Sequence, residues 1–269
     1  MPDPNKQYAP FQPTLTGAGL QQFQLSLEHC VPSKVLKHVV HSYLQISAAK
    51  ATPYPIIPDG TQAIFIGPHS SIIGGAQSQA SDLQIFQAGE YFGIRFYPGA
   101  LRHFFELNLF EITDQFVESH FIPCDKFTQL HNQIYRVHSF QQRANICEQW
   151  LLANLCPTST TAFDQALSII YQSQGNVKVN QLSQSIGWSS RHLNRQFRYH
   201  TGLSTKTFAQ TIRLQHACKH LCLNPNDSLT TALNLGFFDQ AHLLKDYNKR
   251  LLSNPSTFFN RFKSDFYNN

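Results

Sequence analysis

The sequence lacks any apolar run that approaches the roughly 18 residues needed to span a bilayer. Its first ten residues, MPDPNKQYAP, also lack the apolar core of a signal peptide. These absences argue against a membrane-spanning or secreted protein, and we expect a soluble, cytoplasmic chain. In that compartment the six cysteines are expected to be reduced rather than paired in disulfides.

Familiar enzyme motifs are absent as well. The sequence contains no G-x-S-x-G, no Walker phosphate-binding loop and no H-E-x-x-H. Four titratable residues lie in the region where a sheet is predicted, but no spacing among them defines a catalytic pair; they are Asp59, His69, Asp82 and Glu90. Asp59 precedes a glycine, so its expected role is to form a turn. We therefore predict no catalytic residue and no cofactor.

Metal-ligand residues occur in two short pairs in the C-terminal part of the chain. His216 and His220 lie four residues apart, and so do Cys218 and Cys222. On one helix the two pairs point about 200° away from each other, so they do not converge as four ligands. We predict no metal site.

Acidic residues are scarce in the same part of the chain. Residues 160–269 hold 12 Lys and Arg against 5 Asp and Glu, a net charge of +7, whereas residues 1–159 hold 9 against 11, a net charge of −2. This asymmetry is expected if the C-terminal part binds a polyanion and the N-terminal part does not. Between them, residues 157–161 (PTSTT) have no core-forming side chain. We predict a linker there, which separates an N-terminal domain, residues 1–156, from a C-terminal domain, residues 162–269.

Residues 179–200 have the pattern of a helix-turn-helix. Leu182 and Ile186 share one apolar helix face, the helix is broken at Gly187, and Ser189 is placed to cap the next helix. In that second helix Leu193 and Phe197 form a buried pair four residues apart. Its opposite face carries polar side chains without a carboxylate; they are Arg191, Asn194, Arg195 and Arg198. Such a helix suits the DNA major groove, where Arg pairs with guanine and Asn with adenine.

A second copy of this unit is predicted at residues 228–251, and its turn is one residue longer. Its first helix is expected to pack through Leu229, Ala232 and Leu233. Gly236 makes the turn, and Asp239 can cap the following helix. The buried stripe of that helix is predicted to be Leu243, Tyr247 and Leu251. Its outward side chains are Gln240, His242, Lys245 and Lys249.

At these residues the sequence resembles the AraC/XylS family of bacterial transcription regulators. The match runs over G-W-S-S-R-H-L-N-R-Q-F, T-G-L-S, the connecting helix with Arg213, and G-F-x-D-Q-x-H. The resemblance covers about residues 162–264 and implies an all-α domain of two helix-turn-helix units joined by a connecting helix. Two positions depart from the family: Leu243 stands where Phe is usual, and Leu252 where a helix-ending Gly is usual. The second departure puts the geometry of that turn in question.

The implied function is sequence-specific binding of double-stranded DNA, with each unit reading one of two successive major-groove segments. The residues predicted to read bases are Arg191, Asn194, Arg195, Gln240, His242 and Lys245. The residues predicted to contact phosphates are Ser189, Arg198, Lys206, Asp239, Lys249 and Arg250. The resemblance favours transcriptional activation over repression, and activation implies contact with RNA polymerase.

The N-terminal part is predicted to be an α+β domain, a small antiparallel sheet followed by helices. Residues 1 to about 20 are expected to be irregular. Short strands are predicted at residues 23–27, 63–66, 72–75, 83–86 and 91–97. A helical pattern starts after residue 99, and two amphipathic helices are predicted at residues 127–137 and 143–155.

Two phrases of this part, I-P-D-G at residues 57–60 and G-I-R-F-Y-P-G-A at residues 93–100, are similar to the sensor region of one AraC-type subgroup. The similarity implies a module that binds an effector, forms a dimer, or both. The candidate effector-binding residues are Phe65, Phe92, Arg95 and Phe96, because aromatic walls with a few polar groups are usual in small-molecule sites. The alternative is that these rings are core residues and that Arg95 pairs with a carboxylate or faces solvent.

Two other classes of protein remain open at this stage. One is an enzyme, or another small-molecule-handling domain, that carries the DNA-binding module as an accessory. The other is an architectural protein that binds DNA without a preferred site.

Overall fold

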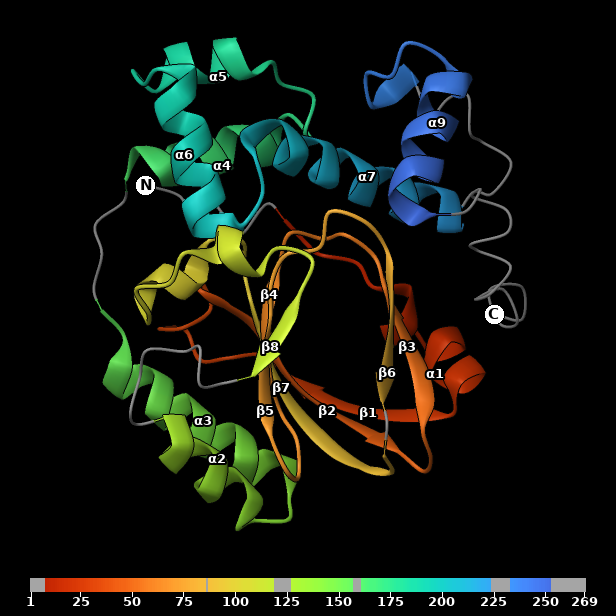
Figure 1. Cartoon of the computed structure of the whole chain (residues 1–269), viewed down its shortest axis with the longest axis vertical. Coiled ribbons are helices and arrows are strands. Elements are labelled where there is room, and N and C mark those ends of the chain that lie inside the picture. The colour runs from red at the N-terminus through yellow and green to blue at the C-terminus, as the bar shows by residue number, and fades with distance from the viewer. Residues whose placement is uncertain (1–7, 86, 119–126, 157–160, 224–232, 253–269) are drawn as a thin grey trace.

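The computed structural model describes residues 8–85, 87–118, 127–156, 161–223 and 233–252. They form an N-terminal part built on antiparallel strands and a C-terminal part built only from helices (Figure 1). The predicted fold class is therefore confirmed.

Antiparallel pairing organises the N-terminal part. One sheet has the strand order β1-β2-β7-β4-β5-β8, and the strands β3 and β6 pair separately beside it (Figure 1). The strand bounds are β1 Leu25–Cys30, β2 Val40–Ala48, β3 Thr52–Ile56, β4 Gln62–Ile66, β5 Ser71–Gly74, β6 Ser81–Ile85, β7 Gly89–Phe96 and β8 Phe116–Glu118. Four predicted strands correspond to β4, β5, β6 and β7, whereas β2, β3 and β8 were not predicted.

Residues 13–23 are more ordered than the Pro- and Gly-rich composition of this region suggests. A short 3-10 helix, η2 (Pro13–Leu15), leads into α1 (Gly17–Phe23), whose first turn is capped by the Thr16 hydroxyl. The expectation of irregular structure was therefore wrong for residues 13–20, whereas residues 8–12 form no helix or strand and residues 1–7 lie outside the described residues. The strand expected at residues 23–27 begins two residues later, after Gln24 ends α1 in the left-handed conformation.

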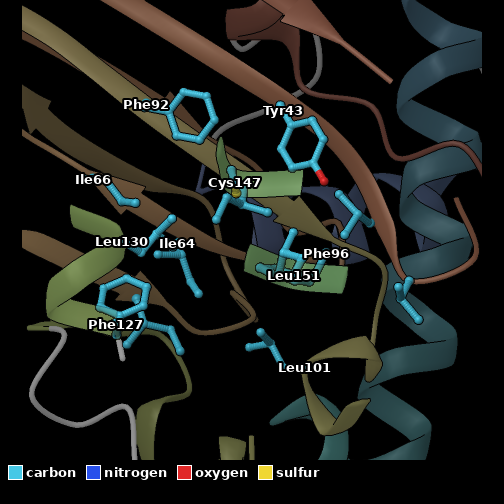
Figure 2. Close-up of a cluster of buried hydrophobic side chains, with 14 of the residues drawn as sticks. Tyr43, Ile64, Ile66, Phe92, Phe96, Leu101, Phe127, Leu130, Cys147 and Leu151 are labelled. Atoms are coloured by element: carbon cyan, nitrogen blue, oxygen red, sulfur yellow. The ribbon is translucent and has the colours of Figure 1, made fainter. Parts of the chain in front are cut away.

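One face of the large sheet packs against helices. α2 (Phe127–Tyr135) and α3 (Phe140–Asn154) cover it, and α3 begins at the cap residue Ser139. Figure 2 shows how Phe92 and Phe96 of β7 lie in one cluster with Leu130 of α2 and Leu151 of α3. The helical pattern after residue 99 gives only two 3-10 helices, η3 (Ala100–His103) and η4 (Leu109–Ile112).

The opposite face of the sheet packs against α1 and the β3–β6 pair, where a smaller apolar cluster forms. Gly93 of β7 faces this side, opposite Phe65 of β4. A Cβ atom at Gly93 would lie 2.8 Å from Leu44 and 3.0 Å from Phe65, so the missing side chain makes room for both. The two faces thus differ, because α2 and α3 close one and the β3–β6 pair with α1 closes the other.

Five described helices form the C-terminal part. They are α4 (Ala162–Gln172), α5 (Val179–Ser185), α6 (Ser190–Thr201), α7 (Thr205–Leu223) and α9 (Gln240–Leu251). In Figure 1, α6 and α9 lie at the two ends of α7. Thr161, predicted as linker, forms a capping box with Asp164 at the start of α4, and residues 157–160 lie outside the described residues. None of the described helices is long and apolar enough to cross a membrane.

The two parts are docked together by buried contacts. Gln215 of α7 donates to the Pro58 carbonyl (2.7 Å) and accepts from the Phe11 amide (2.7 Å). The rings of Tyr8 and Tyr171 stack at 4.9 Å. These contacts show that residues 8–12 and the loop at residues 57–60 pack directly against the helical part.

Candidate functional site

The first predicted reading helix, α6, has the expected capped geometry. The turn before it takes a positive φ at Gly187 (+71°), and the Ser189 hydroxyl accepts from the His192 amide (3.2 Å). Leu193 and Phe197 are fully buried, as predicted. The opposite side exposes three cationic side chains; they are Arg191, Arg195 and Arg198. The guanidinium of Arg195 lies 3.0 Å from the ring of His192.

Asn194 has a structural contact that the sequence did not predict. Its side-chain oxygen accepts from the backbone amide of Thr205 (3.1 Å), the first residue of α7. The first N–H groups of a helix have no partner within the helix, so Asn194 satisfies one of them. This residue therefore joins α6 to α7, and its carboxamide oxygen already accepts one hydrogen bond there.

The second predicted reading helix, α9, is built in the same way. The Asp239 carboxylate accepts from the His242 amide (2.7 Å), and Leu243 and Tyr247 are buried. The predicted base-reading side chains of this helix are exposed; they are Gln240, His242 and Lys245. Lys249 of α9 and Lys206 of α7 are exposed as well. The Asp239 carboxylate is occupied by capping, so only the backbone at this helix end can meet a phosphate.

Arg250 was predicted to contact a phosphate, and the structure corrects this. Arg250 is only 5% exposed, and its guanidinium forms an ion pair with Asp246, one helical turn earlier (3.3 Å). It also donates to Gln210 of α7 (2.6 Å) and to the Ser78 carbonyl of the N-terminal part (3.4 Å). Arg250 thus fastens α9 to the rest of the molecule. Its contact with Ser78 is 172 residues distant in sequence, so no local pattern could have indicated it.

The start of the second unit was predicted only in part. Residues 228–232 lie outside the described residues, so the placement of Leu229 and Ala232 stays a prediction. Leu233, expected to pack inward, is 59% exposed, which corrects that assignment. Leu252 ends α9 with φ +55° and ψ +20°, the conformation that the family's usual Gly would adopt.

The exposed side of α6 faces a cleft of about 600 Å³. Arg191, Arg195 and Arg198 line one side of it, and Phe110 and Asn108 of the N-terminal part line the other. The guanidinium of Arg198 lies 5.1 Å from the centre of the Phe110 ring. The cleft is strongly cationic on the α6 side, as binding of a polyanion requires.

The predicted effector-binding residues do not lie on one face. Phe92 and Phe96 are fully buried in the cluster under α2 and α3 (Figure 2), where Phe92 packs against Tyr43 and Phe140. Neither lines a described cavity, so both are core residues. Phe65 and Arg95 lie on the opposite face, which is hollowed. These four residues were predicted to form one candidate site, and the structure divides them between the two faces of the sheet.

That face holds an apolar cavity of about 430 Å³ between the large sheet and the β3–β6 pair. Aromatic side chains form much of its wall; they are Tyr54, Phe65, Tyr91 and Phe116. Ile46, Ile72, Leu83 and Ile85 add aliphatic wall, and His69, Ser70, Gln84 and Gln87 supply the polar groups. No Asp, Glu, Lys, Arg or Cys is among these lining residues.

A smaller hollow of about 50 Å³ shares walls with this cavity and reaches a buried ion pair. Arg95 donates to Asp59 (2.6 Å), and both side chains are less than a tenth exposed. The other carboxylate oxygen accepts from the Thr61 amide (2.9 Å), which confirms the predicted turn at Asp59. Gln12 also donates to Asp59 (2.7 Å). The ion pair therefore joins the sheet to the loop at residues 57–60, which contacts α7 through Gln215.

Metal-ligand residues do not gather in the part of the chain that the structure describes: no group of three His, Cys, Asp or Glu side chains is placed to hold an ion. His216 and Cys218 both lie on α7. Cys218 is buried, and burial raises the pKa of its thiol to about 12.

Each of the two parts of the chain matches the model of a known domain family. Residues 182–261 match the model of a helix-turn-helix domain, and residues 28–118 match a domain of unknown function (DUF6597). A helix-turn-helix transcriptional regulator of Bacillus subtilis, YbfI, is 39% identical over 70 residues, which are 25% of this chain and 24% of that protein. One from Haemophilus influenzae is 28% identical over 121 residues, 45% of this chain and 39% of that protein.

Among solved structures, ToxT from Vibrio cholerae is similar over 90% of this chain and 99% of its own, with 8% identity and a TM-score of 0.44. A second ToxT structure, with an unsaturated fatty acid bound, covers 90% of this chain with 7% identity and a TM-score of 0.41.

The two capped helices and the matched model define the class of the C-terminal part: it is a helix-turn-helix domain. The helix-turn-helix model that residues 182–261 match is of the AraC type. The chain spans about a quarter to two fifths of the length of the two curated regulators.

Proposed function

We propose that the chain is a sequence-specific transcription regulator whose helices α6 and α9 read two successive major-groove segments. The observation that carries the proposal is the exposed side of α6, where three guanidiniums project from a capped helix that contains no carboxylate. α9 repeats the arrangement with Gln240, His242 and Lys245. An α-helix fits the major groove, and its first residues reach the base edges.

The roles within each helix follow from exposure and contacts. We assign base reading to Arg191, Arg195, Gln240, His242 and Lys245. We assign phosphate contacts to Arg198, Lys206, Lys249 and the backbone at the starts of α6 and α9. Asn194 and Arg250 are reassigned to holding the helices in place. Activation, with contact to RNA polymerase, is the proposed outcome of binding.

Hydroxyl-radical footprinting of a bound promoter fragment tests whether α6 and α9 occupy two successive major-groove segments. Two protected major-groove segments should lie on one face of the duplex, about 10 base pairs or one helical turn apart. Continuous protection with no preferred site would instead indicate an architectural DNA-binding protein.

We further propose that the 430 Å³ cavity binds a largely apolar, uncharged effector and performs no reaction. Its aromatic and aliphatic walls, with four uncharged or weakly basic polar side chains, suit binding by burial and a few hydrogen bonds. The absence of carboxylates and lysines from the lining residues supports binding over catalysis. The Arg95–Asp59 pair and the loop at residues 57–60 would carry the effect of binding to α7.

A neutral apolar fluorophore, N-phenyl-1-naphthylamine, tests the cavity directly. Its fluorescence should rise with the wild-type chain and not with Leu83→Trp, because the larger ring fills the space that Leu83 borders. Phe92→Ala is the control: it removes a core ring from the other face, so folded protein should still bind the probe. Equal binding by wild type and Leu83→Trp would place the probe elsewhere.

A further inference from the structure

The two helix-turn-helix units differ by one residue in the turn before the reading helix. In the first unit, Trp188 separates the turn glycine from the cap Ser189. In the second unit, two residues, Phe237 and Phe238, separate the turn glycine from the cap Asp239. The question is what the additional residue does.

Ring contacts show that Phe237, not Phe238, takes the place of Trp188. The Trp188 ring meets the His192 ring edge-on at 4.6 Å and 83°. The Phe237 ring meets the His242 ring in the same way, at 5.3 Å and 82°. In both units the histidine is the third residue after the cap, and Phe237 is buried. Phe238 is therefore the additional residue, and packing of the unit does not use its ring.

Phe238 is 87% exposed, more than any other large apolar side chain in the described part of the chain. Its backbone is held in place, because its amide donates to Nδ1 of His242 (3.3 Å). That bond makes Nδ1 the acceptor, so in the neutral ring the proton lies on Nε2. The N-terminal end of α9 thus presents an N–H donor from His242 beside an uncovered aromatic ring.

This end of the helix is where a helix-turn-helix unit meets base edges. Most groups on the floor of the major groove are hydrogen-bond donors or acceptors, and the apolar group among them is the C5 methyl of thymine. We propose that Phe238 packs against a thymine methyl in the second half-site and so sets a preference for thymine at one position. The inference rests on the proposed function, because it requires α9 to enter a major groove.

The test uses the full chain and a duplex chosen from a random pool for tight binding. Each thymine of the second half-site is replaced in turn by uracil, which removes only the methyl group. Wild-type affinity should fall roughly two- to fivefold at one position, the size expected when one methyl group is no longer buried. Phe238→Ala should bind the thymine duplex with a similar loss and should show no further loss with uracil.

Two variants complete the design. Phe238→Leu keeps an apolar side chain and should retain part of the sensitivity to uracil. Leu252→Ala is the matched control: it removes another exposed apolar side chain, 65% exposed, from the far end of α9 and should leave the sensitivity unchanged. The inference is overturned if no thymine position responds to uracil, or if Phe238→Ala responds as wild type does. Failure to select any preferred duplex would instead contradict the proposed function.

Discussion

Leu252 adopts a backbone conformation that side chains with a Cβ atom rarely occupy. α6 ends at Gly202 with φ +82°, but α9 ends at Leu252 with φ +55°. The left-handed conformation costs a residue other than Gly about 1–2 kcal/mol. Replacement by Gly removes this cost, but part of the gain in stability is offset because Gly increases the conformational entropy of the unfolded chain. Little buried surface is lost with the leucine side chain, because it is exposed. We expect Leu252→Gly to raise the free energy of unfolding by about 0.5–1 kcal/mol.

Urea denaturation of the full chain measures this effect. Leu252→Ala keeps a Cβ atom and should leave the stability near that of wild type. A glycine variant less stable than wild type would show that the leucine side chain makes a stabilising contact that outweighs the backbone cost.

Two histidines between the sheet domain and the helices give the protein a predicted dependence on pH. Burial, and then the nearby charge of Arg102, lowers the pKa of both His103 and His200 to about 4. In the unfolded chain their pKa is about 6.5, so the unfolded state binds protons first as the pH falls. The stability they contribute is present above pH 6.5 and is lost as the pH falls towards 4.

Unfolding free energies measured between pH 7.5 and pH 4.5 test the direction of this pH dependence. Stability should decline through this range, and the decline should be shallower for His200→Gln, which no longer takes up the proton on unfolding. His138→Gln, at an exposed position, serves as the control and should follow wild type. A His200→Gln variant with the wild-type slope would contradict the assignment.

At the scale of elements, α9 carries two adjacent cationic residues with opposite roles. Lys249 is exposed, and Arg250 is buried against Asp246, Gln210 and the Ser78 carbonyl. Lys249→Ala should weaken binding to all DNA sequences alike and reduce the slope of affinity against salt concentration by about one. Arg250→Ala should leave the buried Asp246 carboxylate without its cation and destabilise the fold by about 3–5 kcal/mol.

DNA titrations at several salt concentrations, paired with urea denaturation, separate the two effects. If both variants changed only the salt slope, Arg250 would be a phosphate contact after all.

Several elements were predictable because their signals are local. The caps at Ser189 and Asp239, the turn glycines and the buried pair Leu193 and Phe197 all follow from spacing within a few residues. Side chains alternate between the two faces of a strand, which places Phe92 and Phe96 of β7 together on the face opposite Arg95. The choice of cavity face was not predictable, because it depends on where α3 and β3 pack, each more than 30 residues from β7 in sequence, and on the pairing of β6 with β3.

The same reasoning applies to two buried cations. Arg250 was misplaced, and for Arg95 the alternative of a carboxylate partner is confirmed although its partner could not be named; each pairs with a carboxylate inside the fold. Asp59 lies 36 residues from Arg95, and a distant contact of this kind leaves no periodic pattern. The contact of Asn194 was also not predictable. Its oxygen accepts from the Thr205 amide only because of the conformation of the turn between α6 and α7.

At the scale of the molecule, the helical domain shares its core with the N-terminal part. Tyr8 and Ala76 belong to the cluster around Phe197, and Ile57 belongs to the cluster around Tyr247. We expect a fragment from residue 160 to fold and bind DNA alone, because its helices bury two apolar clusters of their own. It should be less stable than the same domain in the full chain, since these N-terminal contacts are missing.

Circular dichroism of the fragment, with a thermal melt, checks this prediction. A cooperative helical melt at a lower temperature than that of the full chain is the expected result. A fragment without a cooperative transition would show that the division at residues 157–161 does not separate independent folding units.

The central claim is that α6 and α9 read two DNA segments in sequence, and selection of bound duplexes from a random pool tests it most directly. The selected duplexes should share two short sequence blocks about one helical turn, or roughly 34 Å, apart. The same selection with Arg195→Ala should relax one or two positions in a single block and leave the other block intact, at a cost of about 1–3 kcal/mol in affinity. Selected duplexes that share no sequence, or a single block that Arg195→Ala leaves unchanged, would contradict the account.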